Sequence, residues 1–217
     1  MGDPPDYKPV TRQIDEVSRT LKNWTPPGRR PVDGDVLANF TFGDREPTLE
    51  SVHDQPGCRV TALRVPPSAC FDPVTNDRQG RRGFSVACRL GPRGSERDTF
   101  EFTLRPAGDS RHLKLTVLRA ALWREAGSPC RRLTVEARIG TDKAPQALGA
   151  LDFGEASASG WQERALAIPS SFPGVEGEVT VRLLPDGHLT PALVRLDDLK
   201  LHGFVRDADE PKEGAKP

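Results

Sequence analysis

Apolar and polar residues alternate with a period of two through most of the chain between residues 36 and 204. The clearest run is 133–139, where Leu, Val, Ala and Ile alternate with polar residues. Since successive side chains of a strand point to opposite faces of its sheet, this alternation predicts half-buried strands. Comparable runs occur at 38–42, 60–62, 84–88, 100–104, 113–117, 166–168, 179–183 and 194–204. We therefore expect roughly nine or ten short strands, packed as an all-β, two-sheet antiparallel jelly-roll β-sandwich.

The last of these runs changes phase at Asp197 and Asp198. Val194 and Leu196 share one parity, and the leucines that follow share the other. A strand that buries one face cannot change phase without turning its side chains over, unless a bulge takes up the extra residue. We therefore predict a bulged last strand with two carboxylates at the bulge.

The two ends of the chain and one internal stretch differ from this β pattern. Residues 11–24 place apolar side chains at helical spacing, which predicts one amphipathic helix within an N-terminal extension, 1–35. Such a helix either docks a partner or a membrane surface, or packs on its own domain. The proline-rich stretch 25–31 predicts a stiff linker, and the charged stretch 205–217 predicts a disordered tail. The stretch 66–82 has no strand pattern, so we expect a long loop there, either functional or a plain insertion.

Charge and composition exclude some classes of function. The chain carries 31 basic and 31 acidic residues, so no global field would draw it to nucleic acid or anionic lipid. No apolar run approaches the roughly 20 residues that cross a bilayer, and the N-terminus does not have the pattern of a signal peptide. We therefore expect either a cytoplasmic protein or the trimmed mature domain of an exported one.

The cysteines bear on that choice. Cys58, Cys70, Cys88 and Cys130 contain no Cys-x-x-Cys pair and do not have the spacing of a zinc site. Their even number favours two disulfides in an exported protein, and the sequence does not choose among the possible pairings. The alternative is four buried thiols that serve as small hydrophobic side chains.

Several short stretches together resemble a known class of domain. They are 37–43, 100–106, 113–116, 160–161, 179–184 and 196–199. In this order they resemble the exported bacterial jelly-roll domains that often precede PEP-CTERM sorting tails, and more distantly the carbohydrate-binding modules with a galactose-binding-like β-sandwich. The resemblance covers 36–204 and implies an extracellular or cell-surface protein. One departure is that this sequence does not show the membrane-spanning tail of such sorted proteins.

The resemblance also implies a structural calcium ion between the first and last strands. Asp197 matches the aspartate of the family's last strand, and the other candidate ligands are Asp198, Thr41 and Asp44. Calcium takes six to eight hard oxygen ligands, so paired carboxylates and backbone carbonyls at a bulge suit it. The alternative is that the two carboxylates of the bulge face solvent or pair with a neighbouring cation, Arg195 or Lys200.

Sugar binding in such modules needs exposed aromatic rings, because the C–H groups of a pyranose stack on flat faces. Trp24 and Tyr7 fall outside the expected sandwich, and Trp161 stands at a position that corresponds to core in the resembling family. Trp123, next to Arg124, is therefore the best candidate platform for a polysaccharide or another cell-surface ligand. The alternative is a tryptophan that covers the edge of the core.

Signatures of catalysis are missing from the sequence. The histidines are scattered outside any ligand spacing, and neither a Gly-x-Ser-x-Gly elbow nor a glycine-rich phosphate loop occurs. Glu101 and Glu136 would form a retaining glycosidase pair only if strand pairing brought them within about 5 Å of each other. We therefore expect a non-catalytic recognition or adhesion module, with polysaccharide as the candidate ligand. The alternatives are a structural surface-assembly module without a small ligand, and a sandwich-fold glycoside hydrolase.

Overall fold

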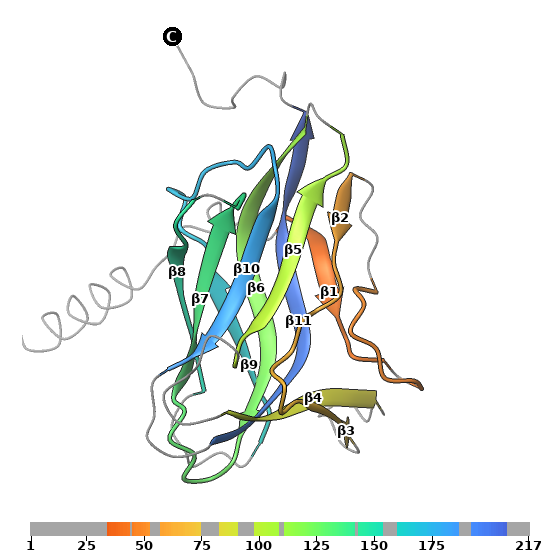
Figure 1. The fold of residues 1–217 in the computed structure, drawn as a ribbon, viewed down its shortest axis with the longest axis vertical. Coiled ribbons are helices and arrows are strands. Elements are labelled where there is room, and N and C mark those ends of the chain that lie inside the picture. The colour runs from red at the N-terminus through yellow and green to blue at the C-terminus, as the bar shows by residue number, and fades with distance from the viewer. Residues whose placement is uncertain are drawn as a thin grey trace, which may run out of the picture. The chain divides into compact units, whose positions relative to one another are not determined.

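The computed structural model describes the chain in segments, which are 34–43, 45–52, 57–74, 83–90, 98–108, 111–141, 143–153, 160–186 and 192–207. Within them the strands form two antiparallel sheets that face each other (Figure 1). The predicted all-β class and the two-sheet sandwich are confirmed. The predicted helix 11–24 and linker 25–31 lie outside the described residues.

The six-stranded sheet has the long last strand at its centre. Its order is β3 (Cys70–Val74), β4 (Gly83–Leu90), β11 (Ala192–Asp207), β6 (Arg111–Arg124) and β9 (Gln162–Ala167), and β1 (Asp35–Phe40) also pairs with β11. One side of β11 pairs with β6 along its length. The other side pairs first with β4 and then with β1. The opening strand therefore lies beside the last strand, as the resemblance to sandwich modules implies.

The five-stranded sheet covers the other side of the core. Its order is β2 (Cys58–Val60), β5 (Phe100–Pro106), β10 (Val179–Pro185), β7 (Arg132–Ile139) and β8 (Gln146–Asp152). The core consists of the buried positions of each alternating run, and Phe40 of β1 meets Phe102 of β5 edge to face, with ring centroids 5.1 Å apart. Burial of one such aromatic side chain contributes about 1.5–3 kcal/mol. Because the core uses the inward positions, the outward positions of both sheets are left to polar residues.

The predicted bulge in the last strand is confirmed. In the register of β11 against β6, Asp197 lies opposite Ala121 and Lys200 opposite Arg119, so β11 has one residue more than its partner between these pairs. Asp198 takes up the difference with a φ of 47°, in the left-handed region that aspartate tolerates better than most residues. Its backbone N–H donates to the Asp197 carboxylate, 2.7 Å away, which satisfies a donor that the ladder leaves unused.

Two strands correct the expectation from the sequence. β3 lies within 66–82, where we expected a loop, and Pro73 is tolerated there because β3 is an edge strand that pairs only with β4. In β8 the buried residues Leu148 and Leu151 are three positions apart rather than two. Between them, Gly149 has a φ of 141° beside a shift in register against β7. An irregular strand of this kind loses the period of two on which the sequence-based prediction depends.

The last strand also extends further than predicted. β11 continues through Asp207, so the first residues of the predicted tail 205–217 belong to the sheet. Val205 lies opposite Leu113 of β6, and Arg111 Nε donates to Asp207 Oδ1 at 3.0 Å. Residues 208–217 lie outside the described part of the chain.

The four cysteines are all described, and each is a free thiol. The structure therefore does not support the predicted disulfides, and the alternative of buried thiols describes three of the four: Cys58, Cys88 and Cys130 are buried, whereas Cys70 on the edge strand β3 is exposed. Burial away from water raises the pKa of Cys58 to about 11 and that of Cys130 to about 12. These thiols stay protonated at neutral pH and pack as small hydrophobic groups.

Candidate functional site

Trp123 lies on the outer face of the six-stranded sheet, opposite Arg195 in the register of β6 and β11. The guanidinium carbon of Arg195 is 4.5 Å from the centroid of the indole ring, which is a cation–π contact. Arg195 also forms an ion pair with Asp72 of β3, with 2.6 Å between Nη2 and Oδ2. The half-exposed indole is therefore held by contacts that cross from β6 over β11 to β3.

Arg124, the predicted companion of Trp123, lies on the other side of the sheet. Since successive side chains of a strand alternate, Arg124 points inward and is buried, with 6% of its surface exposed. Its Nη1 donates to the carbonyl oxygen of Ser128 at 2.8 Å, which ties β6 to the turn that follows it. The structure therefore places Trp123 on the outer face of the sheet and Arg124 on its inner face.

A hollow of about 450 Å³ lies beside Trp123 on the same outer face. Its lining consists of Arg119, Ala120, Ala121, Glu163, Arg164, Ala165, Asp198 and Lys200. Ala121 is two residues from Trp123 along β6, which corresponds to about 7 Å, and the small side chains of Ala121 and Ala165 leave the sheet surface open. The guanidinium of Arg164 is used elsewhere, because its Nε donates to the carbonyl of Asp152 in the facing sheet at 2.6 Å. The volume is within the range of small-ligand sites in proteins.

Charged groups of both signs line this hollow. Lys200 Nζ lies 2.7 Å from the carboxylate of Asp198, at the bulge. Arg119 lies opposite Lys200 in the register, and Glu163 approaches from β9. Together with Arg164, whose hydrogen-bond partner is a neutral carbonyl, three cations and two carboxylates line the hollow, which offers hydrogen-bond donors and acceptors with a net charge of only +1.

The predicted calcium ligands come only partly together. The pairing of Phe40 with Leu199 brings the chain after β1, including Thr41, towards the bulge at Asp197 and Asp198. The Asp198 carboxylate already has the Lys200 ammonium as a partner, which is the alternative that the sequence left open. Asp44 lies outside the described residues, and among those described no group of three or more His, Cys, Asp or Glu side chains could hold a metal. Calcium at the bulge therefore stays a prediction.

The two carboxylates considered for a glycosidase lie on the opposite sheet. Arg182 of β10 stands between Glu101 of β5 and Glu136 of β7 in the register. The two glutamates are thus two strand spacings apart, about 10 Å, and Glu101 binds both Arg64 and Arg182. This arrangement does not fit a retaining pair, which needs about 5 Å between the carboxyl groups.

Sequence reasoning missed several residues of this face. Arg119 has the parity of Trp123 along the same strand, so the alternation alone could have placed it on the same face. Asp72 and Glu163 could not have been found in this way, because they come from β3 and β9, whose places beside β4 and β6 depend on the strand order.

Comparison with known proteins gives likeness in fold alone. No protein-family model and no curated protein matches this sequence. Among solved structures, the CBM22-1 xylan-binding domain of Paenibacillus barcinonensis Xyn10C has a TM-score of 0.42 at 14% identity, over 78% of this chain and 95% of that one. The family 30 carbohydrate-binding module of a Clostridium thermocellum cellulosomal cellulase has a TM-score of 0.38 at 11% identity, over 82% and 95%.

A third structure, the CBM22-1 and GH10 modules of Clostridium thermocellum Xyn10B, has a TM-score of 0.43 at 12% identity, over 79% of this chain. This chain spans 29% of the length of that one. At these identities and TM-scores the three structures are β-sandwich neighbours that assign this chain neither a ligand nor a site. PEP-CTERM sorting, which the sequence resemblance implied, stays a prediction. None of the described segments forms a helix with the length and hydropathy to cross a membrane.

Proposed function

We propose that this protein is a non-catalytic recognition module that binds a neutral polysaccharide on the outer face of its six-stranded sheet. The observation that carries the proposal is the hollow lined by alanines and by charged groups of both signs, on the same face as the half-exposed Trp123.

The chemistry of the hollow suits a neutral sugar. Each sugar hydroxyl both donates and accepts hydrogen bonds, so a sugar is bound well by cations and carboxylates placed side by side. Lys200 and Asp198 form such a pair, and Arg119 and Glu163 border the same space. A free anion or cation would gain little there, because charged groups of both signs line the space and their net formal charge is only +1.

The indole of Trp123 supplies the second element of sugar recognition. A neighbouring sugar unit would stack its C–H groups on the indole surface that Arg195 leaves free. Because Asp72 and Arg195 hold the ring in place, little conformational freedom is lost on binding, which favours affinity. An extended glycan lying along β6 would thus meet the hollow and the ring in succession.

A structural surface-assembly module without a small ligand is the competing proposal. It would use the same sandwich as a spacer and would leave the hollow empty. Extracellular or cell-surface placement belongs to the recognition proposal and stays a prediction; fractionation of the native host would test it.

A glycan array with neutral and acidic polysaccharides tests the proposal directly. We expect the wild-type protein to bind at least one neutral glycan, and Trp123→Ala to lose about tenfold in affinity, as for an aromatic side chain at the centre of an interface. Phe71→Ala is the matched control, because Phe71 is also an exposed aromatic residue but alternates with Asp72 along β3 and so points away from the face that carries Trp123. Silence of the wild-type protein would favour the structural module, and equal binding by Trp123→Ala would move the site elsewhere.

A further inference from the structure

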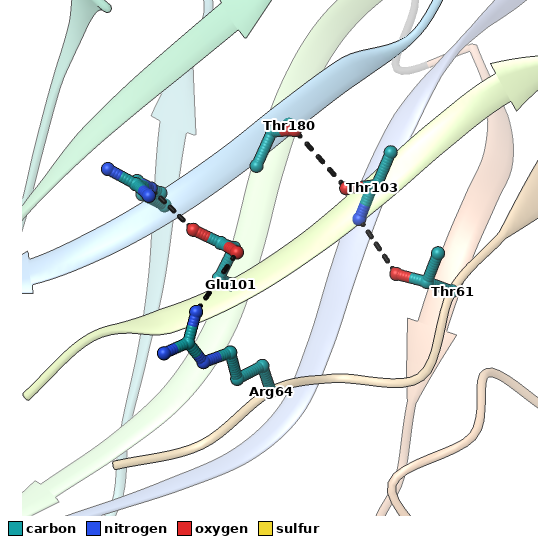
Figure 2. Close-up of polar contacts among 6 residues, drawn as sticks. Thr61, Arg64, Glu101, Thr103 and Thr180 are labelled. Carbon is teal, nitrogen blue, oxygen red and sulfur yellow. Dashed lines mark hydrogen bonds and ion pairs between the residues drawn. The ribbon is translucent and has the colours of Figure 1, made fainter. Parts of the chain in front are cut away.

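The outer face of the five-stranded sheet carries polar side chains in rows that cross its strands (Figure 2). In one row the hydroxyl oxygens of Thr103 and Thr180 are 3.2 Å apart and share a hydrogen bond. Thr61 Oγ1 accepts from the backbone N–H of Thr103 at 3.0 Å, which extends the row past the edge of β5. These three residues, the threonine row, form a flat strip of hydroxyl groups.

The next row holds a carboxylate between two guanidinium groups. Glu101 of β5 is bound by Arg182 of β10 and by Arg64 from the segment after β2, the latter with 3.6 Å between Nη1 and Oε1 (Figure 2). The Glu101 side chain is 18% exposed, so the contacts remove most of it from water. Pairs of this kind are stronger than hydrogen bonds between neutral groups. Glu101 is therefore an example, on this same face, of a carboxylate that is bound by two arginines from neighbouring segments.

On the other side of the threonine row, two arginines lie opposite each other on neighbouring strands. Arg59 of β2 lies directly opposite Arg105 of β5, and both are exposed. If the register of β10 and β5 is continued by one residue, Glu178 lies opposite Arg105 on its other side, but among the described residues neither arginine forms an ion pair. Like charges directly opposite each other on neighbouring strands lower stability. Two guanidinium side chains are thus exposed on neighbouring strands without an ion-pair partner in the described part of the chain, whereas Arg64 and Arg182 in the other row share Glu101.

The face as a whole is basic. Its outward charged residues from β2 to β7 are Arg59, Arg64, Arg105, Arg132, Arg138 and Arg182 against Glu101, Glu136 and Glu178, six cations and three carboxylates. Arg138 lies opposite Thr180 at the end of the threonine row, and its buried Nε has no hydrogen-bond partner within the described part of the chain. An anionic ligand would complement this face, whereas the hollow of the other sheet has cations and carboxylates in nearly equal number.

We propose that Arg59 and Arg105 bind a carboxylate of an acidic polysaccharide, a polyuronate, whose next sugar units lie across the threonine row. A protein partner would call for apolar and aromatic contacts at the centre of its interface, and the rows consist of arginine, threonine and glutamate. Single-stranded nucleic acid would call for aromatic side chains on which bases stack, and the rows contain none. A chain of hydroxyl and carboxylate groups needs only the donors that this face presents. This second site is independent of the one proposed for neutral glycans.

Affinity electrophoresis of the full chain through gels containing polygalacturonate tests the proposal. The variant is Arg59→Ala with Arg105→Ala, and the control is Arg89→Ala with Arg206→Ala, which removes the same two charges from the six-stranded sheet. We expect the wild-type protein and the control to be retarded at low salt. The Arg59 and Arg105 variant should lose about tenfold or more in affinity, since two charge-assisted contacts are removed. Thermal melts of all three proteins establish that each is folded.

Further probes distinguish the other occupants. Retardation by polygalacturonate but not by polyglutamate or single-stranded DNA supports the polyuronate, and dextran sulfate should bind more weakly. Equal losses of affinity for polygalacturonate in both double variants would show that only net charge matters. That result would overturn the site at Arg59 and Arg105. Stronger binding to polyglutamate, DNA or dextran sulfate would overturn the occupant, and no retardation by polygalacturonate would overturn both. Because neutral glycan binding is measured separately, failure here leaves the function proposed for Trp123 and the hollow unchanged.

Discussion

The outer faces of the two sheets differ in a way that follows from strand register. On the five-stranded sheet, β5, β10 and β7 pair without a shift, so the outward side chains align in flat rows. On the six-stranded sheet the bulge at Asp198 interrupts the register between β11 and β6, and the surface there forms a hollow with alanines in its lining. One sandwich thus presents a basic, flat face and a concave site lined by charged groups of both signs. A regular register produces rows of like groups, and an interrupted one produces a hollow.

The most direct test of this difference between the two faces is to fill the hollow. Ala121→Leu places a branched side chain in the lining, where it occupies the space proposed for a sugar unit. We expect loss of neutral glycan binding by about a hundredfold, about 3 kcal/mol, with polygalacturonate binding unchanged. Titration calorimetry with the best glycan of the array measures the first, and affinity electrophoresis measures the second.

Ala147→Leu is the matched control, because Ala147 is an exposed alanine of β8 on the other sheet. It should leave neutral glycan binding as in the wild-type protein. If Ala121→Leu bound the neutral glycan normally, the hollow would not be its site, and Trp123 would have to act on another part of the face.

A smaller effect is expected on stability from the row around Glu101. Glu101→Gln leaves Arg64 and Arg182 beside a neutral amide, and both lose a charged partner that is largely shielded from water. We expect the free energy of unfolding to fall by about 1–2 kcal/mol. Urea denaturation measures it. Glu136→Gln, on the same face but without an ion pair in the described part of the chain, should change it by less than about 0.5 kcal/mol.

The same experiment on the other face sharpens the contrast. Asp198→Asn removes one half-exposed ion pair, with Lys200, and such surface pairs contribute about 0.2–1 kcal/mol. If Glu101→Gln lowered the free energy of unfolding by no more than Asp198→Asn does, the two ion pairs of Glu101 would contribute no more than one surface pair. Glu101 would then no longer serve as the example for a carboxylate bound by Arg59 and Arg105.

The sequence could predict features that depend on residues within one strand, but not contacts between residues far apart in the chain. The bulge at Asp198 was predictable, because a change of parity is visible within one strand. The outward position of Trp123 follows from the same parity, as does the inward position of Arg124, which we nevertheless expected beside it. The clamp of Asp72 on Arg195 was not predictable, since it joins residues far apart in the chain through the strand order.

The smallest expected effect is the change in the free energy of unfolding when one arginine of the pair across β2 and β5 is replaced. The sign of that change is informative. Arg105→Thr removes one of two like charges that face each other and places a second outward threonine on β5, next to Thr103 on the same face. If Arg105 is kept for a ligand, the unliganded protein should become more stable by about 0.2–1 kcal/mol, and the gain should shrink as salt screens the repulsion. Arg89→Thr on β4, whose arginine has no such neighbour opposite it, should show no gain. A loss of stability in Arg105→Thr would mean that the arginine supports the fold, and the cost of the like-charge pair would then no longer argue for a ligand between the two side chains.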